Sequence, residues 1–528
     1  MKSMPLLAVT CLAMMGFSQR PATPVGSPPP LQELPQRPIE LPVMACGELA
    51  NRDFSTLADA PLQVISAKED AGVPVCHFEG LIAPQVRFRL DLPTTGYRGR
   101  YLEAGCGGNC GQISTRLEPR CANSHVTDGG FAVAASDSGH SGRGETWAAD
   151  AQMRIDYAYR ADHVTLIAAR ALLTAFYGRP PDFAYFAGCS DGGREGLEEA
   201  QRYPGDFQGI LAGSPSIRLA EVVEEFFWAA EKNSDAAGNS LFDSANASLL
   251  HQAVLKACDD LDGVADGQID DPRRCAFDPG TLLCPAGTTS MCLSPAQVQA
   301  ARDLYSGPVD SQGRKLHWGG QPHGSELTWS GRPSGQFPST FVTWMIYGGH
   351  PPASMDVNHW HFTRETLENL AHDGAIYDAR NPDLAGFRDH GGKLIMWQNF
   401  ADVAAGENST LAYYQSVRDA MGGLEQVRRF ARVFMIPAGY HCSGGYIAYD
   451  EDLLGSLINW VEKATPADKV ISRATLPDGV ERTRPIYAYP TRAVYTGSGD
   501  VNDVQNFRAE VPGKDPDDHF HWLGEGIR

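Results

Sequence analysis

One serine of this chain has the sequence context of an activated nucleophile. Residues 188–192, Gly-Cys-Ser-Asp-Gly, form a G-x-S-x-G motif that follows an apolar run and precedes a helical pattern. Glycines on both sides allow a sharp strand-to-helix turn that lifts the hydroxyl of Ser190 out of a sheet. The following helix then points its N-terminus toward a developing oxyanion. The motif alone also occurs in glycine-rich turns, but its flanking elements favour a catalytic serine.

A serine hydroxyl is a weak nucleophile unless a base takes its proton, so a histidine after a later strand is required. His441, one of fifteen histidines, lies in a glycine-rich loop directly after an apolar run. The orienting acid is expected after the preceding strand, where Asp402 stands. Asp402 could instead be the N-cap of a helix over residues 403–414. The order Ser190, Asp402, His441 is that of α/β-hydrolases.

Cysteines stand next to two of these residues, since Cys189 precedes the serine and Cys442 follows the histidine. A disulfide between them would hold both loops together, because bridged Cα atoms lie about 4.4–6.8 Å apart. Two buried thiols are the alternative. The segments that they bracket predict three further pairs: Cys46–Cys76, Cys258–Cys275 and Cys284–Cys292. Cys106, Cys110 and Cys121 stay unassigned.

An acidic loop over residues 258–271 has the composition of a cation site. Calcium takes about six to eight oxygen ligands, which carboxylates and backbone carbonyls of a glycine-containing loop supply. The loop predicts a structural calcium ion, and a solvated acidic loop is the alternative. The expected ligands are the side chains of Asp259, Asp262 and Asp266 and the carbonyl oxygens of Val264 and Gln268.

Short apolar runs alternate with helical stretches in the rest of the chain, which predicts a mostly parallel sheet covered on both faces. A helix is expected over 158–177, and strands are expected over 100–104, 131–136, 183–188, 209–213, 393–398 and 432–437.

Residues 214–390 interrupt this alternation and are rich in Gly, Trp, Asp and Ser. Inserted between two strands of an open sheet, this segment would lie above the carboxyl ends of the strands, where ligands bind. The predicted fold class is therefore α/β: an α/β-hydrolase fold with a mostly parallel sheet and a large inserted lid domain. Residues 44–213 and 391–528 form the catalytic domain, and residues 214–390 form the lid domain with the calcium loop.

The N-terminus indicates export. Residues 1–18 have the charged, apolar and small-residue zones of a signal peptide, and the Pro-rich residues 19–43 predict a flexible lead-in. A secreted or periplasmic protein is expected. A lipid anchor on Cys11 is disfavoured, because Thr10 stands where a small residue is needed.

Charge and hydropathy limit the partners. The formal charge of -20 argues against nucleic acid, which demands a basic face, so a neutral or weakly polar small substrate fits better. No later stretch reaches the roughly 20 apolar residues that span a bilayer. The sequence predicts no oligomeric state.

Taken together, the Cys-Ser pair, the His-Cys pair and the D-x-x-D-G-x-x-D-G loop resemble the tannase and feruloyl esterase family, including a bacterial branch that hydrolyses terephthalate monoesters. The resemblance implies an acyl-enzyme mechanism on esters of aromatic acids. It also implies that the backbone amides of Asp191 and Gly108 are the oxyanion donors. Relatives carry a His-Gly pair ahead of the acid, where this chain has Gln398 and Asn399.

Three functions are compatible with these residues. The first is a secreted serine carboxylic ester hydrolase that acts on feruloyl or galloyl esters, which are attached to plant polysaccharide or polyphenol. The second is an acyltransferase that passes the same acyl-enzyme to an alcohol. The third is a catalytically silent, calcium-stabilised binding protein, which the intact Ser190, Asp402 and His441 disfavour.

Overall fold

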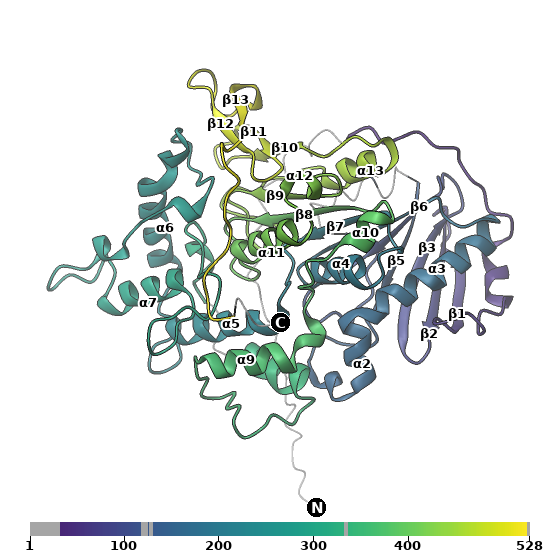
Figure 1. The fold of residues 1–528 in the computed structure, drawn as a ribbon, viewed down its shortest axis with the longest axis horizontal. Helices are drawn as coiled ribbons and strands as arrows, with labels where there is room; N and C mark the ends of the chain where they lie inside the picture. Colours follow the sequence, from purple (N-terminus) through teal and green to yellow (C-terminus); the bar gives the residue numbers. More distant parts are fainter. Residues whose placement is uncertain (1–31, 118–124, 126–129, 332–335, 525–528) are drawn as a thin grey trace, which may run out of the picture.

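A nine-stranded sheet organises the chain in the computed structural model, which describes residues 32–524 apart from 118–124, 126–129 and 332–335 (Figure 1). The sheet has the order β1-β2-β3-β5-β4-β6-β7-β8-β9. The strands are β1 (Leu62–Glu69), β2 (Val75–Ile82), β3 (Val86–Pro93), β4 (Arg100–Ala104), β5 (Phe131–Ser136), β6 (Phe183–Cys189), β7 (Gly209–Gly213), β8 (Lys393–Asn399) and β9 (Ala431–Ile436).

The strands from β4 to β9 pair in parallel, and β1 to β3 form an antiparallel extension that joins the sheet through β5. The six predicted strands are β4 to β9, so the α/β-hydrolase fold class is confirmed. Every residue of β4, β5, β7 and β9 is buried, as expected for parallel strands covered on both faces. The strands β1 to β3 were not predicted. Buried residues alternate with more exposed ones in β2 and β3, and only the first residue of β1 is buried.

Helices cover both faces of this sheet (Figure 1). Phe186 of β6 packs into the core on one face, and its neighbours Tyr185 and Ala187 pack into the core on the other. The first core includes residues of α3 (Ala161–Tyr177), α4 (Asp191–Arg202) and α11 (Glu407–Ala420), and the second includes α13 (Leu453–Lys463). The predicted helix 158–177 is α3, preceded by a π-helical turn, η4 (Asp156–Arg160).

The insertion between β7 and β8 contributes no strand to the sheet within its described residues. One apolar cluster lies wholly within the insertion, and a second also includes Cys110 and Tyr157 of the catalytic domain. Phe387, near the end of the insertion, belongs to the core of the sheet. Most helices of the insertion lie beside one end of the sheet, as its helices are labelled in Figure 1. The helices of the insertion are α5 (Leu219–Lys232), α6 (Ser244–Cys258), α7 (Pro295–Ser306), α8 (Gln336–Phe341), α9 (Arg364–Asp373) and α10 (Ala385–Asp389). That this insertion acts as a lid stays a prediction.

Shorter elements complete the chain. Two hairpins near the C-terminus pair β10 (Lys469–Thr475) with β11 (Glu481–Tyr487) and β12 (Arg492–Tyr495) with β13 (Phe507–Glu510). The remaining helices are α2 (Ala151–Ile155), α12 (Leu424–Val427), η1 (Cys46–Asn51), η3 (Thr146–Ala149), η5 (Asp259–Asp262), η6 (Pro272–Arg274), η7 (Pro279–Leu282), η8 (Glu326–Thr328), η9 (Val342–Ile346), η10 (Ala375–Tyr377) and η11 (Val504–Asn506).

The described part of the lead-in, residues 32–43, makes specific contacts with the catalytic domain. Gln32 N–H donates to Asp452 at 2.7 Å, and Arg37 pairs with Asp182. The predicted signal peptide, Cys11 and Cys121 lie outside the described residues. None of the described helices is long and apolar enough to cross a membrane.

Candidate active site

Ser190 lies at a sharp turn between β6 and α4. Its φ of 65° and ψ of -118° are strained for a residue with a side chain, which is typical of a nucleophile elbow. A Cβ atom at Gly188 would lie 2.6 Å from the backbone of Gly192, and one at Gly192 would lie 2.8 Å from the carbonyl oxygen of Cys106. The glycines of the motif are therefore required by close backbone packing.

The three predicted triad residues meet at this turn. His441 Nε2 lies 2.8 Å from Ser190 Oγ, and its Nδ1 lies 2.8 Å and 3.0 Å from the two carboxylate oxygens of Asp402. They come from the ends of β6, β8 and β9, which are brought together although Ser190 and His441 are 251 residues apart. This chain of contacts can carry a proton from the serine hydroxyl to the imidazole and stabilise the resulting imidazolium.

The Asp402 carboxylate is fully buried and well supplied with donors. It accepts the N–H groups of Ala404 at 2.8 Å and Ala405 at 3.2 Å, and Gln398 Nε2 donates to it at 2.9 Å. Burial opposes ionisation, but the interaction with His441 and the N–H groups of Ala404 and Ala405 outweigh it and hold the pKa of Asp402 below its usual value. Asp402 is therefore ionised in neutral solution.

The alternative role of Asp402 as a helix N-cap does not match the structure, because α11 begins at Glu407 with Gly406 as its N-cap. Gln398 contacts the triad, which its place in the sequence did not predict. Thr410 donates to Gln398 Oε1 at 2.9 Å, which leaves the amide Nε2 to hold the carboxylate, and Asn399 donates to the carbonyl oxygen of Tyr440. The Gln-Asn pair thus braces both the acid and the histidine loop.

Disulfides link several parts of this site. Cys189 and Cys442 are bridged with their Cα atoms 5.9 Å apart, so the nucleophile and histidine loops are covalently joined. The other three predicted pairs, Cys46–Cys76, Cys258–Cys275 and Cys284–Cys292, are also present. Cys106 and Cys110, which the sequence left unassigned, are bridged to each other.

The two predicted oxyanion donors lie on segments that flank Ser190. Asp191 is the first residue of α4, so its N–H has no acceptor within the helix. Its buried carboxylate pairs with Arg194, at 2.5 Å from Nε. Gly108 belongs to the loop after β4, where a Cβ atom at Gly107 would lie 3.9 Å from the carbonyl oxygen of Cys189.

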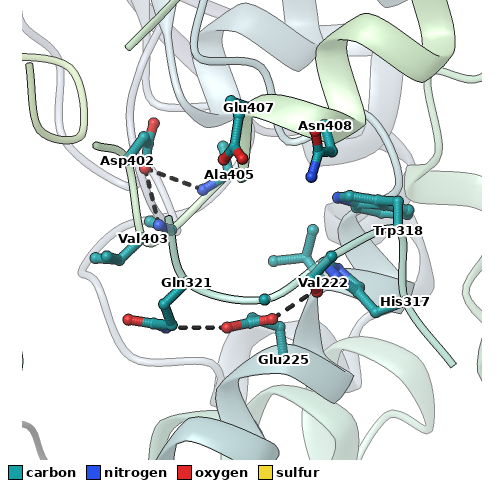
Figure 2. Close-up of a pocket in the computed structure, with 14 residues that line it drawn as sticks. Val222, Glu225, His317, Trp318, Gln321, Asp402, Val403, Ala405, Glu407 and Asn408 are labelled. Carbon is teal, nitrogen blue, oxygen red and sulfur yellow. Dashed lines mark hydrogen bonds and ion pairs between the residues drawn. The ribbon is translucent and has the colours of Figure 1, made fainter. Parts of the chain in front are cut away.

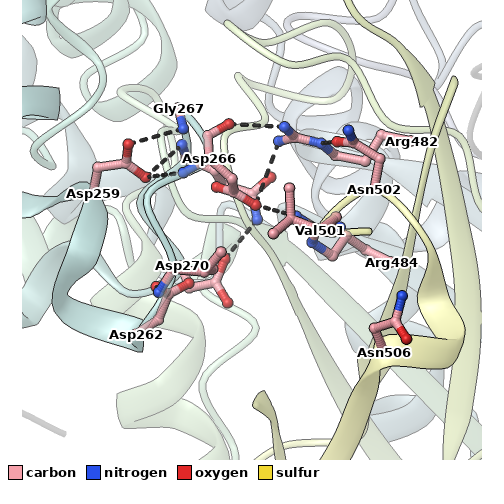
Figure 3. A network of polar contacts seen from close by, with 12 residues as sticks. Asp259, Asp262, Asp266, Gly267, Asp270, Arg482, Arg484, Val501, Asn502 and Asn506 are labelled. Carbon is pink, nitrogen blue, oxygen red and sulfur yellow. Dashed lines mark hydrogen bonds and ion pairs between the residues drawn. The ribbon is translucent and has the colours of Figure 1, made fainter. Parts of the chain in front are cut away.

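The predicted calcium loop is closed mainly by its own hydrogen bonds (Figure 3). The Asp259 carboxylate accepts the N–H groups of Asp266, Gly267 and Gln268 at 2.9–3.1 Å. In the described chain, this loop is not among the groups in which three His, Cys, Asp or Glu ligand atoms gather within 4.8 Å. The structure therefore does not bring the carboxylates of Asp259, Asp262 and Asp266 to one point, and the Val264 N–H donates to Asp262 at 3.0 Å.

Other features of the loop fit a cation. Asp262 and Asp270 face each other, and burial with this neighbouring charge raises the pKa of Asp262 to about 8. Oδ1 of Asp266 is buried without a hydrogen-bond partner. Arg484 pairs with Oδ2 of Asp266, and Arg482 donates to its carbonyl oxygen at 2.8 Å (Figure 3). Of these carboxylates, only that of Asp266 pairs with the two guanidinium groups. Asp262 and Asp270 therefore remain able to take a cation as a partner. Asp270 belongs to the acidic loop but was not among the expected ligands.

A small cavity lies behind Asp402, between the acid loop, the start of α11 and the insertion (Figure 2). Its buried polar side chains include Glu225, which accepts from Gln321 at 2.9 Å, and His317, whose pKa burial lowers to about 4. Glu407 also lines it, and burial raises the pKa of this carboxyl to about 8. The cavity therefore holds a neutral carboxyl close to the ionised acid.

We expect Glu407 to make stability fall with rising pH. The pKa of this carboxyl is about 8 in the folded protein against an ordinary 4.5, so between these values the folded chain keeps a proton that the unfolded chain has lost. Stability then declines from pH 4.5 to 8 by a few kcal/mol and levels off above. Glu407→Gln should flatten this decline and melt higher than wild type at pH 8, as measured by thermal unfolding at pH 5 and 8.

Glu425 is exposed, so Glu425→Gln is the matched control and should keep the wild-type pH dependence. An unchanged decline in Glu407→Gln would contradict the assignment of a neutral buried carboxyl at this position.

Comparison with known proteins decides the family. The family model described as tannase and feruloyl esterase matches residues 71–509. The chain belongs to this family. The esterase is 33% identical to mono(2-hydroxyethyl) terephthalate hydrolase of Piscinibacter sakaiensis, over 81% of this chain and 82% of the relative. It is 30% identical to a probable feruloyl esterase B of Emericella nidulans, over 77% and 80% of the two chains.

Solved structures agree on the fold of the esterase. Feruloyl esterase B from Aspergillus oryzae matches with a TM-score of 0.74 at 24% identity, covering 88% of this chain and 99% of that one. Tannin acyl hydrolase from Aspergillus niger matches with a TM-score of 0.68 at 19% identity, covering 86% and 90%. Family membership makes this chain a carboxylic ester hydrolase.

Proposed function

We propose that this esterase is a serine hydrolase that cleaves esters of aromatic acids through an acyl-enzyme. The observation that carries the proposal is the continuous contact from Ser190 Oγ through His441 to the buried Asp402 at a strained strand-to-helix turn. A serine on such a turn, with a histidine and an ionised acid in line, has the geometry of an activated nucleophile.

The mechanism follows from the roles of these groups. Ser190 Oγ attacks the ester carbonyl carbon while its proton moves to His441 Nε2, and the N–H groups of Asp191 and Gly108 stabilise the oxyanion. Collapse of the tetrahedral intermediate expels the alcohol, which takes the proton from His441. Water then repeats the sequence on the acyl-enzyme, with His441 again as base, and releases the acid.

An aromatic cluster beside the loop that carries Gly108 supports the preference for aromatic acids. Cys110 of the loop is a buried member of a cluster with Tyr157 of η4 and Phe227 of the insertion. Partly buried rings, among them Trp147 and Trp344, pack against the same cluster. Planar rings favour stacked or edge-to-face contacts with an aromatic acyl group.

A panel of esters tests the substrate class. Methyl ferulate, methyl gallate and mono(2-hydroxyethyl) terephthalate are compared with methyl octanoate, with release of the free acid as the readout. At least one aromatic ester should show a kcat/KM at least about tenfold above that of the aliphatic ester. Equal or faster cleavage of methyl octanoate would contradict the aromatic preference. Added ethanol should not divert most of the acyl group to an ethyl ester, as a transferase would.

We also propose that the acidic loop binds a structural calcium ion. The facing carboxylates of Asp262 and Asp270 and the unpartnered oxygen of Asp266 support it. Because an ion that binds only the folded state stabilises it, EGTA should lower the melting temperature by about 5 °C and excess calcium should restore it. Asp262→Asn should lose this response, and Asp260→Asn, at an exposed position of the same loop, should keep it. Identical melting in EGTA and in calcium would refute the site.

Finally, we propose that the esterase is exported to an oxidising compartment. Five disulfides among the described residues support it, since such bridges persist outside the reducing cytosol. N-terminal sequencing of protein recovered outside the cell should show cleavage near residue 18. Recovery of the whole pool inside cells with free thiols would contradict export.

A further inference from the structure

The loop that carries Gly108 is closed by a short disulfide. Cys106 and Cys110 are four residues apart and are bridged with their Cα atoms separated by 5.4 Å. Gly108 has a φ of 63°, and Cys110 has a φ of 52°. A glycine-rich loop loses much backbone freedom on folding and has many competing conformations. A covalent bridge across it removes most of them.

Within this loop, one hydrogen bond fixes the peptide group between Gly107 and Gly108. The Cys110 N–H donates to the carbonyl oxygen of Gly107 at 3.3 Å. In a trans peptide the carbonyl and the N–H point in opposite directions, so this contact directs the Gly108 N–H away from the bridge. Both contacts close the loop onto Cys110, the bridge from Cys106 and the hydrogen bond from Gly107. Loss of the bridge would therefore free this peptide to rotate.

Glu195 anchors the loop to the helix that begins at the nucleophile. Its Oε2 accepts the Cys106 N–H at 2.9 Å, and its Oε1 lies 3.0 Å from Cys106 Sγ and 3.5 Å from Cys110 Sγ. A Cβ atom at Gly192 would lie 2.8 Å from the Cys106 carbonyl oxygen, so the loop and the elbow are in direct backbone contact. Glu195 thus ties the position of Gly108 to that of α4.

The other side of the loop is held by two rings. The Tyr157 hydroxyl donates to the Gly108 carbonyl oxygen at 3.1 Å, and His140 Nε2 lies 2.7 Å from the Asn109 carbonyl oxygen. Burial raises the pKa of Glu195 well above its usual value, so this carboxyl adds no negative charge beside a developing oxyanion. The loop that carries Gly108 is therefore held on both sides, and Glu195 adds no negative charge to it.

We propose that the Cys106–Cys110 disulfide and Glu195 are positioning residues that hold the Gly108 N–H as the second oxyanion donor. This inference rests on the proposed serine mechanism and assigns a role in it to residues that do not touch the substrate. Removing one oxyanion donor typically lowers kcat about 10²- to 10³-fold. Loosening its loop should cost less, because the donor remains available for part of the time.

The test compares Cys106→Ala/Cys110→Ala with Cys284→Ala/Cys292→Ala, which removes another short disulfide, in the insertion. In the first variant we expect kcat to fall by about 10- to 100-fold, with KM within about threefold of wild type. The inhibition constant of an arylboronic acid, which forms a tetrahedral adduct with the serine, should rise in proportion to the loss of kcat. The control variant should keep wild-type kcat even where its melting temperature falls.

A second pair of variants keeps the proposal testable if the first variant does not fold. Glu195→Ala should lower kcat and weaken the boronic acid in the same way, and Glu195→Gln, which retains an acceptor for the Cys106 N–H, should restore most of both. The positioning role would be overturned by an unchanged kcat in Cys106→Ala/Cys110→Ala or in Glu195→Ala. An equal loss of kcat in Cys284→Ala/Cys292→Ala would overturn it as well. Failure of the serine mechanism is distinguishable, because Ser190→Ala would then keep its activity.

Discussion

Ser190→Ala should lower kcat for the best aromatic ester by roughly 10⁴- to 10⁶-fold while the protein remains folded. The hydroxyl is the atom that forms the acyl-enzyme, and it lies 2.8 Å from His441 Nε2 at a strained turn. Since alanine removes one oxygen atom and leaves Cys189 bridged, unfolding should not explain the loss. The measurements are acid release under saturating substrate and thermal unfolding of the same preparation.

Ser498→Ala, at an exposed position in the segment between the last two strands, is the matched control and should keep full activity. Residual turnover of Ser190→Ala above about one hundredth of wild type would point to another nucleophile or to direct attack by water.

Asp402→Asn should lower kcat about 10⁴-fold with little change in KM. The carboxylate lies 2.8 Å from His441 Nδ1, where it fixes the tautomer that leaves Nε2 free to take the serine proton. An asparagine keeps the shape but can present its NH₂ group to the ring, and it lacks the charge that stabilises the imidazolium. In the wild type, Gln398 Nε2 donates to the Asp402 carboxylate. In the variant, the Gln398 amide therefore faces the amide of the new asparagine side chain instead of a carboxylate.

The control for this variant is Asp389→Asn, which changes an exposed carboxylate at the end of α10 and should leave both kinetic constants unchanged. A loss smaller than about tenfold in Asp402→Asn would show that another acid orients His441.

The features that the sequence predicted are those with strong local signals. The runs that became β4 to β9 are buried on both faces, so their apolar character is continuous and is visible without any tertiary information. Ser190, Asp402 and His441 could be placed because each follows such a strand, and parallel strands bring their carboxyl ends to one edge. The Cys189–Cys442 bridge followed from that same placement.

The features that were missed depend on contacts between distant residues. Arg484 reaches Asp266 across 218 positions of sequence, and nothing local to the acidic loop indicates that partner. Glu195 meets Cys106 across 89 positions, so the bridge between Cys106 and Cys110 could not be tied to the oxyanion loop in advance. In the sequence, Gln398 stands out only as a departure from relatives, since its bond to Asp402 depends on a side-chain orientation that Thr410 fixes.

The most direct test of the serine mechanism uses a fluorophosphonate, which reacts covalently with an activated serine. The modified residue is then identified by peptide mass mapping. After reduction of the Cys189–Cys442 bridge and digestion, a single adduct on the peptide containing Ser190 is expected. The adduct should form much more slowly in His441→Ala, because this variant lacks the base that activates the hydroxyl. An adduct on a different residue, or no adduct in a preparation that still hydrolyses esters, would contradict Ser190 as the nucleophile.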